Sequence, residues 1–261
     1  MALLGPDFVA ARHKPLLVNA NPRGPLVSLG LGLLLLVISL LLQFGMGSLI
    51  RRTALNELPG VIDEQVLSVL IGMFPAALIV AALALWIAGR KGSSAREVLN
   101  LRLPALGAAG YGLVIGGFVM VMAVLLIALA GLVQVFGSGP PDQGMLENFI
   151  GRLSQQPAIF GFVVPGIILG APLSEELIFR GQLFTGLAQG PLGYRGAAVV
   201  SSAAWAILHY TGQWLQVGSI FLMGLVLCWI LRRYGSLWIT MVCHALWNSM
   251  TVLAVAGAAA S

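Results

Sequence analysis

Six polar residues in the second half of the chain have the types and spacing needed for acid–base chemistry. They occur in the segments EELIFR, WAILH and HALWN, and they are Glu175, Glu176, Arg180, His209, His244 and Asn248. Glutamate and histidine are common proton-transfer groups in enzymes. Asparagine and histidine N–H groups can stabilise a developing negative oxygen. The set therefore indicates a polar site at which acid–base chemistry is possible.

The first segment predicts one paired carboxylate and one free carboxylate. Glu176 and Arg180 are four residues apart, so on a helix they share a face and can form an ion pair. Glu175 lies about 100° further round the helix and is free to face another element. Pro172 precedes both carboxylates and lacks a backbone N–H, so it should bend the helix at this point.

The composition places these residues in a membrane protein. Of the 261 residues, 59% are hydrophobic and only 9% are charged, whereas soluble domains carry roughly a quarter charged residues. The net charge is +5, but the basic residues lie in short gaps between apolar runs. That pattern is typical of topology signals and anionic lipid headgroups, and it argues against a nucleic-acid partner.

The apolar runs predict an all-α integral membrane protein with about seven transmembrane helices. A spanning helix needs about 20 mostly apolar residues, and the runs lie near 26–49, 66–89, 107–136, 157–189, 195–214, 216–232 and 236–257. The lysine and arginine bias predicts a cytoplasmic amino terminus and an external carboxyl terminus. Residues 1–150 would then provide topology and a candidate substrate gate, and residues 151–261 a catalytic core.

The predicted helices bring the polar residues to similar depths. With a rise of about 1.5 Å per residue, Glu175 and His209 each lie about 21 Å from the cytoplasmic end of their span. His244 and Asn248 lie about 14 and 20 Å from theirs. Polar groups inside membranes are expensive, and one or two suffice to join helices. Six on three helices of the carboxyl-terminal half favour a functional site.

The three segments also resemble a known family. EELIFR fits Glu-Glu-x-x-x-Arg, WAILH fits aromatic-x-x-x-His, and HALWN fits His-x-x-x-Asn. In that order they resemble the CAAX protease and bacteriocin-processing (CPBP, or Abi) family of intramembrane proteases, over roughly residues 155–253. Trp205 is a departure, because the family usually has phenylalanine there; it is another large apolar ring.

The resemblance implies a role for each residue. Glu175 and His209 would position and activate a water molecule, and His244 and Asn248 would stabilise the oxyanion. Arg180 would hold Glu176 in place and keep it ionised.

A metal is the alternative to direct water activation. Glu175, His209 and His244 could form the two-histidine, one-carboxylate shell of a catalytic zinc or another divalent ion. The chain has no HExxH segment, and we expect a reaction without a cofactor.

The expected function is an intramembrane endopeptidase that acts on membrane-associated proteins or peptides within the lipid bilayer. The expected location is a bacterial inner membrane, with the chain crossing it several times. Two other functions fit the same residues: a non-catalytic immunity or binding module, and a proton-coupled transporter, since intramembrane glutamate and histidine also relay protons. A transporter would be expected to show repeat symmetry, which the sequence lacks.

Overall fold

The chain folds as an all-helical bundle. The computed structural model describes residues 3–17, 21–54, 64–90, 94–136, 151–210 and 213–260. Every regular element among these residues is helical, as the sequence predicts. The helices outside the central one are α1 (Pro6–His13), α2 (Pro25–Ala54), α3 (Glu64–Ala88), α4 (Ala95–Val98), α5 (Ala108–Phe136), α10 (Gly193–Ile207), α11 (Trp214–Tyr234) and α12 (Leu237–Ala260).

The central helix is composite and runs from Pro157 to Leu187 without a break. It alternates α-helical and π-helical turns, and we call it the composite helix. Its parts are α7 (Pro157–Pro165), η2 (Gly166–Gly170), α8 (Ala171–Glu175), η3 (Glu176–Phe184) and α9 (Thr185–Leu187). Such π-helical turns are rare and occur frequently at functional sites.

Within the part of the chain that the structure describes, six helices are long and apolar enough to cross a membrane: α2, α3, α5, the composite helix, α11 and α12. The protein is therefore an integral, multi-pass membrane protein. The seventh predicted span, 195–214, is not confirmed. It forms α10, which has 15 residues and is about 22 Å long, short of the roughly 30 Å hydrocarbon core.

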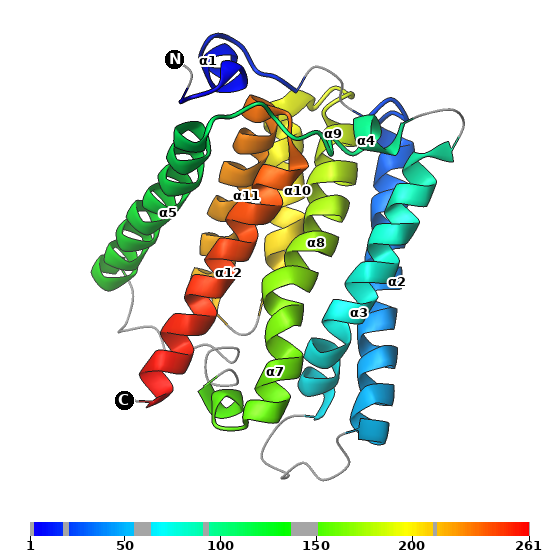
Figure 1. Ribbon diagram of the computed structural model, residues 1–261, viewed down its shortest axis with the longest axis vertical. Coiled ribbons are helices and arrows are strands. Elements are labelled where there is room, and N and C mark those ends of the chain that lie inside the picture. Colours follow the sequence, from blue (N-terminus) through cyan, green and yellow to red (C-terminus); the bar gives the residue numbers. More distant parts are fainter. Residues whose placement is uncertain are drawn as a thin grey trace.

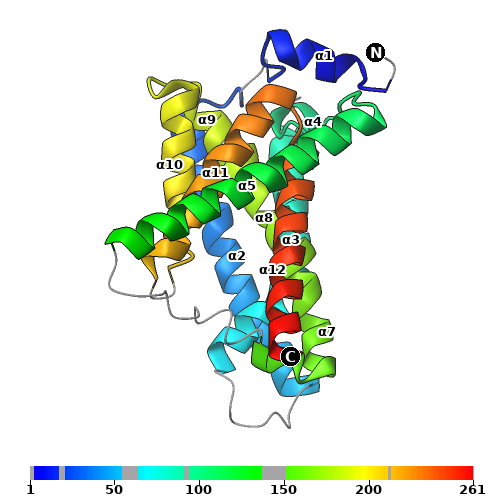
Figure 2. The ribbon, with the colours of Figure 1, turned by 90° about the vertical axis from the view of Figure 1, so that its left-hand side faces the viewer.

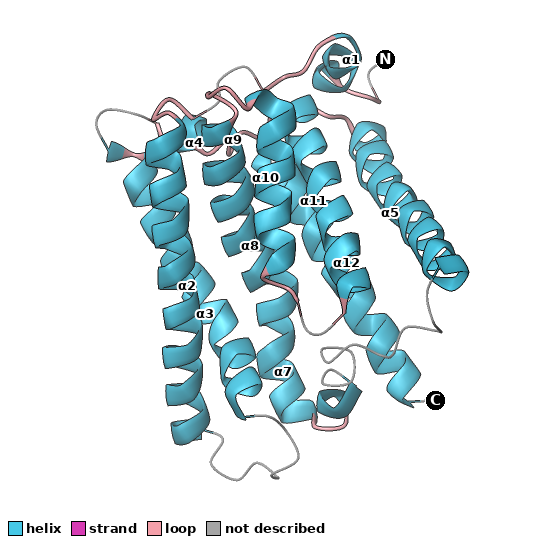
Figure 3. Cartoon of the chain, turned by 180° about the vertical axis from the view of Figure 1, so that it is seen from behind, coloured by secondary structure: helices cyan, strands magenta, loops and turns pink. Residues whose placement is uncertain are grey.

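α10 ends at Ile207, well before the end of the predicted span. The N–H groups of His209 and Tyr210 bond to the carbonyls of Ala206 and Ile207, three residues back, in a tightened last turn. α10 consequently stops part-way along the bundle (Figure 3), and His209 lies just beyond its end.

The helices are arranged around the composite helix (Figure 1). α2 and α3 pair with each other on one side of it, and α12 lies on the other side. α2 and α3 lie so close together that a Cβ atom at Gly72 would be only 1.8 Å from the carbonyl oxygen of Gln43. Glycine thus allows backbone contact between membrane helices. α5 is tilted across the bundle and contacts α11 and α12 (Figure 2).

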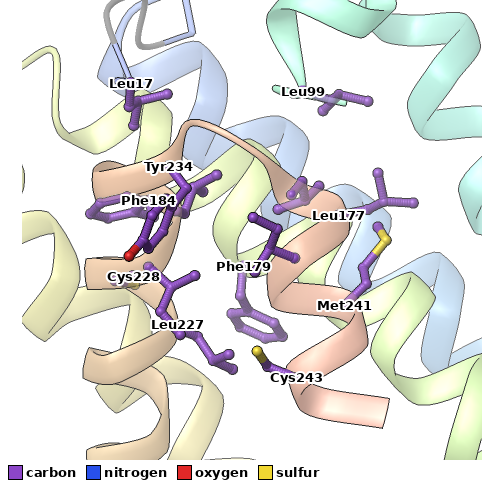
Figure 4. Packing of buried hydrophobic residues seen from close by; sticks show 14 of the residues in the cluster. Leu17, Leu99, Leu177, Phe179, Phe184, Leu227, Cys228, Tyr234, Met241 and Cys243 are labelled. Atoms are coloured by element: carbon purple, nitrogen blue, oxygen red, sulfur yellow. The ribbon is translucent and has the colours of Figure 1, made fainter. Parts of the chain in front are cut away.

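An apolar core fixes α11 and α12 to the composite helix. Figure 4 shows Phe179 and Phe184 of the composite helix, Leu227 and Cys228 of α11, and Cys243 of α12 gathered in one cluster. Because protein interiors are close-packed, these contacts limit the sliding and rotation of the three helices.

The amino-terminal end of the bundle is closed by polar contacts. Arg102 pairs with Asp7 at 3.2 Å and donates to the carbonyl oxygens of Tyr234 and Gly235 at 2.8 and 3.1 Å. Gly235 has φ 61°, a conformation that suits glycine. These bonds hold the short turn between α11 and α12, and thereby set the depth of the residues on α12.

The predicted orientation can be tested by cysteine labelling. Lys14 and Thr53 are exposed near opposite ends of the bundle, and the native Cys228 and Cys243 are buried. A membrane-impermeant maleimide should label Thr53→Cys in intact cells and Lys14→Cys only after permeabilisation. The reverse pattern would show that the amino terminus is external.

Candidate active site

Pro172 creates an unpaired carbonyl in the composite helix, and Asn248 satisfies it. In η2 the N–H of Ala171 bonds to the carbonyl of Gly166, five residues back. The next bond of that kind would join residue 172 to Ile167, but proline has no N–H. The side-chain amide of Asn248, on α12, donates to the Ile167 carbonyl instead, at 2.8 Å.

α10 is joined to η3 in a similar way. The Ser201 hydroxyl donates to the backbone carbonyl of Phe179 at 2.7 Å. Ser201, Trp205 and His209 are spaced four residues apart, so they follow one face of α10 and its last turn. The Ser201 bond therefore turns Trp205 and His209 toward the composite helix.

The first cluster contains Glu175, Trp205 and His209. The indole N–H of Trp205 donates to Oε2 of Glu175 at 2.5 Å, and Nε2 of His209 lies 3.9 Å from the same oxygen. The side chains of Glu175 and His209 are 20% and 32% exposed. Both reactive groups are therefore reachable from outside the protein interior.

The second cluster contains Glu176, Arg180 and His244. Oε1 of Glu176 accepts from Nη1 of Arg180 at 3.0 Å and from Nδ1 of His244 at 3.1 Å. The side chains of Glu176 and Arg180 are 0% exposed. The ion pair between residues 176 and 180 has the predicted spacing, and its burial excludes Glu176 from contact with a substrate.

The Trp205 ring connects the two clusters. The centroid of its ring lies 5.4 Å from that of His209 and 5.2 Å from that of His244, both in edge-to-face geometry. The guanidinium carbon of Arg180 lies 4.0 Å from the ring centroid. Trp205, on α10, thus contacts residues of the composite helix and of α12, as well as His209 just beyond the end of its own helix.

Five of the six predicted residues are brought together in this way, and the hydrogen bond of the sixth goes to another part of the composite helix. Glu175, Glu176, Arg180, His209 and His244 form the two clusters joined by Trp205. Asn248 instead bonds to η2. A primary amide has two N–H groups, so the bond to Ile167 uses one and leaves a second.

The role of Trp205 was missed by sequence reasoning, which treated the residue as a large apolar ring. One signal could have found it. Trp205 precedes His209 by four residues, so the indole lies on the histidine's face of the helix. A buried indole N–H usually finds a hydrogen-bond partner, and an unpaired carboxylate at the same depth was available.

A comparison with known families agrees with the three motifs. A family model described as type II CAAX prenyl endopeptidase Rce1-like matches residues 157–250. This segment is therefore similar to that family. It begins with α7, ends within α12 and contains all six predicted site residues. No curated protein and no solved structure matches the chain.

The geometry of the site favours one tautomer of His209. Nδ1 of His209 lies 2.9 Å from the backbone carbonyl of Trp205. A carbonyl only accepts hydrogen bonds, so Nδ1 carries the proton and Nε2 of the neutral ring is an acceptor. The lone pair of Nε2 therefore faces Glu175, and the 3.9 Å gap allows one water to bond to both at about 2.8 Å.

The three residues of the alternative zinc shell do not form a ready set of ligands. Among the described residues, no three His, Cys, Asp or Glu side chains group closely enough to hold a metal ion. Glu175 and His209 belong to one cluster, whereas Nδ1 of His244 is directed to Glu176. A chelation experiment can test whether the reaction depends on a metal.

The buried ion pair between Glu176 and Arg180 should be essential for stability. Removing one partner of a buried pair leaves an uncompensated charge, which costs about 3–5 kcal/mol. Arg180→Met should lower the unfolding free energy in detergent by this amount, and Glu176→Gln combined with Arg180→Met should lose less. Glu64→Gln, in an exposed pair with Arg51, is the control and should cost about 0–1 kcal/mol. An unchanged Arg180→Met protein would contradict the assignment.

Asn248 should stabilise the helix through the carbonyl that Pro172 leaves unpaired. Asn248→Leu should cost about 1–3 kcal/mol, the penalty of an unsatisfied buried polar group. In a Pro172→Ala background the backbone regains a donor, so the same substitution should cost clearly less. A double-mutant cycle of thermal unfolding measures the difference. Equal costs in both backgrounds would show that Asn248 does not replace the missing backbone bond.

Proposed function

We propose that this protein is an intramembrane endopeptidase that hydrolyses peptide bonds of membrane-associated proteins or peptides, with Glu175 and His209 activating the attacking water. The observation that carries the proposal is the difference between the two adjacent carboxylates. Glu176 is sealed in an ion pair, whereas Glu175 is partly exposed and faces the unprotonated nitrogen of His209. The match of residues 157–250 to an endopeptidase family supports the same chemistry.

The reaction begins with a water molecule held between Glu175 and His209. Glu175 removes one proton as the water oxygen attacks the carbonyl carbon of the peptide bond. The carbon–oxygen bond forms, and the carbonyl oxygen becomes negative. When the carbon–nitrogen bond breaks, the proton passes from Glu175 to the leaving amine. The products are a new carboxyl group and a new amino group.

His209 orients the water in this scheme. Its ring is fixed by the bond from Nδ1 to the Trp205 carbonyl, so Nε2 accepts the second water proton as a hydrogen bond. Holding the water in one orientation converts a random encounter into a positioned attack, which can supply several kcal/mol of the barrier reduction.

His244 and Asn248 are proposed to stabilise the oxyanion. Nδ1 of His244 donates to Glu176, so donation from its Nε2 requires the doubly protonated ring, and Glu176 lies beside that ring to balance its charge. Asn248 would donate its second amide N–H. Removing one donor of this kind typically costs about 100- to 1,000-fold in kcat.

Purified protein in liposomes provides the test. The probes are a farnesylated peptide ending in a CAAX sequence and an unlipidated apolar peptide, each with a fluorophore and a quencher across the cleavage region. Glu175→Ala and His209→Ala should each reduce cleavage by about 100- to 10,000-fold. The matched controls, Glu64→Ala and His13→Ala, remove the same residue types at exposed positions and should cleave like the wild type.

A chelator distinguishes direct activation of water by the side chains from the metal-dependent mechanism. Cleavage that survives chelation supports direct water activation by Glu175 and His209. Cleavage that is lost on chelation and restored by zinc supports the metal alternative. If Glu175→Ala and His209→Ala cleave as well as the wild type, or keep the biological function without cleavage, the proposal is wrong and the protein acts by binding.

A further inference from the structure

Trp205 contacts both members of the water-activating pair. Its indole N–H donates to Oε2 of Glu175 at 2.5 Å, and its backbone carbonyl accepts from Nδ1 of His209 at 2.9 Å. We infer that Trp205 is a positioning residue, whose indole N–H fixes the carboxylate of Glu175 relative to His209. The inference rests on the proposed function, and it assigns a role to a group that a phenylalanine at this position would lack.

The indole N–H determines the rotation of the Glu175 side chain. Glu175 is only 20% exposed, so the protein supplies most of its surroundings. A carboxylate in such a place is held by the donors that reach it. The Trp205 N–H binds the oxygen that faces His209, and each carboxylate oxygen can accept a second bond. That oxygen therefore remains available to a water molecule.

The end of α10 explains why the backbone of Trp205 is available to His209. In a continuing α-helix, the N–H of residue 209 would bond to the carbonyl of residue 205. Here the His209 N–H bonds to Ala206 at 3.0 Å. The Trp205 carbonyl is one of the orphan acceptors of a helix end, and the imidazole of His209 satisfies it. The early end of α10 thus sets the tautomer of the histidine.

Neighbouring side chains hold the indole ring of Trp205 in place. Arg180 lies over the ring at 4.0 Å, and Arg180 is fixed by its bond to Glu176 at 3.0 Å. On α11, a Cβ atom at Gly224 would lie 2.7 Å from Cβ of Ser202 and 3.2 Å from Nη2 of Arg180, so glycine there makes room for both side chains. The ring is 1% exposed. Glu176 thus acts on Glu175 indirectly, through Arg180 and then Trp205.

Trp205→Phe is the direct test, because phenylalanine keeps an aromatic ring and removes the N–H. A small misplacement of a reacting group can reduce the rate about 100-fold, so we expect kcat to fall by about 10- to 100-fold. KM should stay within about twofold, because a positioning group acts in the transition state more than in substrate binding. The control is Trp238→Phe, which removes an indole bond to the Leu101 carbonyl outside the two clusters and should leave kcat unchanged. A kcat of Trp205→Phe within about twofold of the wild type would overturn the inference.

A spectroscopic measurement tests the hydrogen bond without any cleavage. In indole-¹⁵N-labelled protein, the N–H resonance missing from Trp205→Phe belongs to Trp205. If Trp205→Phe does not fold, benzothienylalanine at position 205 keeps the two-ring shape and gives the same assignment. Glu175→Leu should move this resonance upfield, and Glu64→Gln should not. An unmoved resonance would overturn the inference, whatever the protein cleaves; a moved resonance in a protein without cleavage would overturn only the proposed function.

Discussion

The structure depends on a fully buried ion pair inside a membrane helix. Glu176 and Arg180 are 0% exposed and 3.0 Å apart. A charge in the centre of a bilayer costs about 2.5–3.5 kcal/mol even on the mildest scales, so both residues need partners. His244 supplies a second bond to Glu176. Among the described residues, Nε and Nη2 of Arg180 have no hydrogen-bond partner, and the face of Trp205 covers the guanidinium instead. The contacts that His244 and Trp205 make with the buried pair therefore hold α12 and α10 against the composite helix.

The backbone of the composite helix, like its buried charges, needs hydrogen-bond partners within the protein. Inside a membrane every backbone group needs a partner within the protein. Pro172 leaves the Ile167 carbonyl without a backbone donor, and Asn248 of α12 supplies one. Ser201 of α10 adds a donor to the Phe179 carbonyl. These bonds place α10 and α12 at defined depths. As a result Glu175, at the junction of α8 and η3, meets His209 at the end of a helix that does not cross the bundle.

Much of this site could be predicted from the sequence because charges in membranes are so restricted. The four-residue spacing of Glu176 and Arg180 predicted their ion pair, and equal helical depths predicted that Glu175 and His209 would meet. The end of α10 could not be predicted from apolarity alone, because the window 195–214 contains enough apolar residues for a span. The bond between Asn248 and Ile167 depends on a π-helical turn, for which single sequences carry no reliable pattern. The indole bond of Trp205 depends on rotamers that only the packed structure defines.

The most direct test of the account is the fate of labelled water in a single turnover. Excess protein in liposomes would cleave a peptide probe in ¹⁸O water, and mass spectrometry would locate the label. Activation of water by Glu175 predicts ¹⁸O in the new carboxyl group of the product, none in the Glu175 side chain, and no cleavage by Glu175→Gln. Label in Glu175 would instead indicate a covalent intermediate on that carboxylate. Undiminished cleavage by Glu175→Gln would contradict the account altogether.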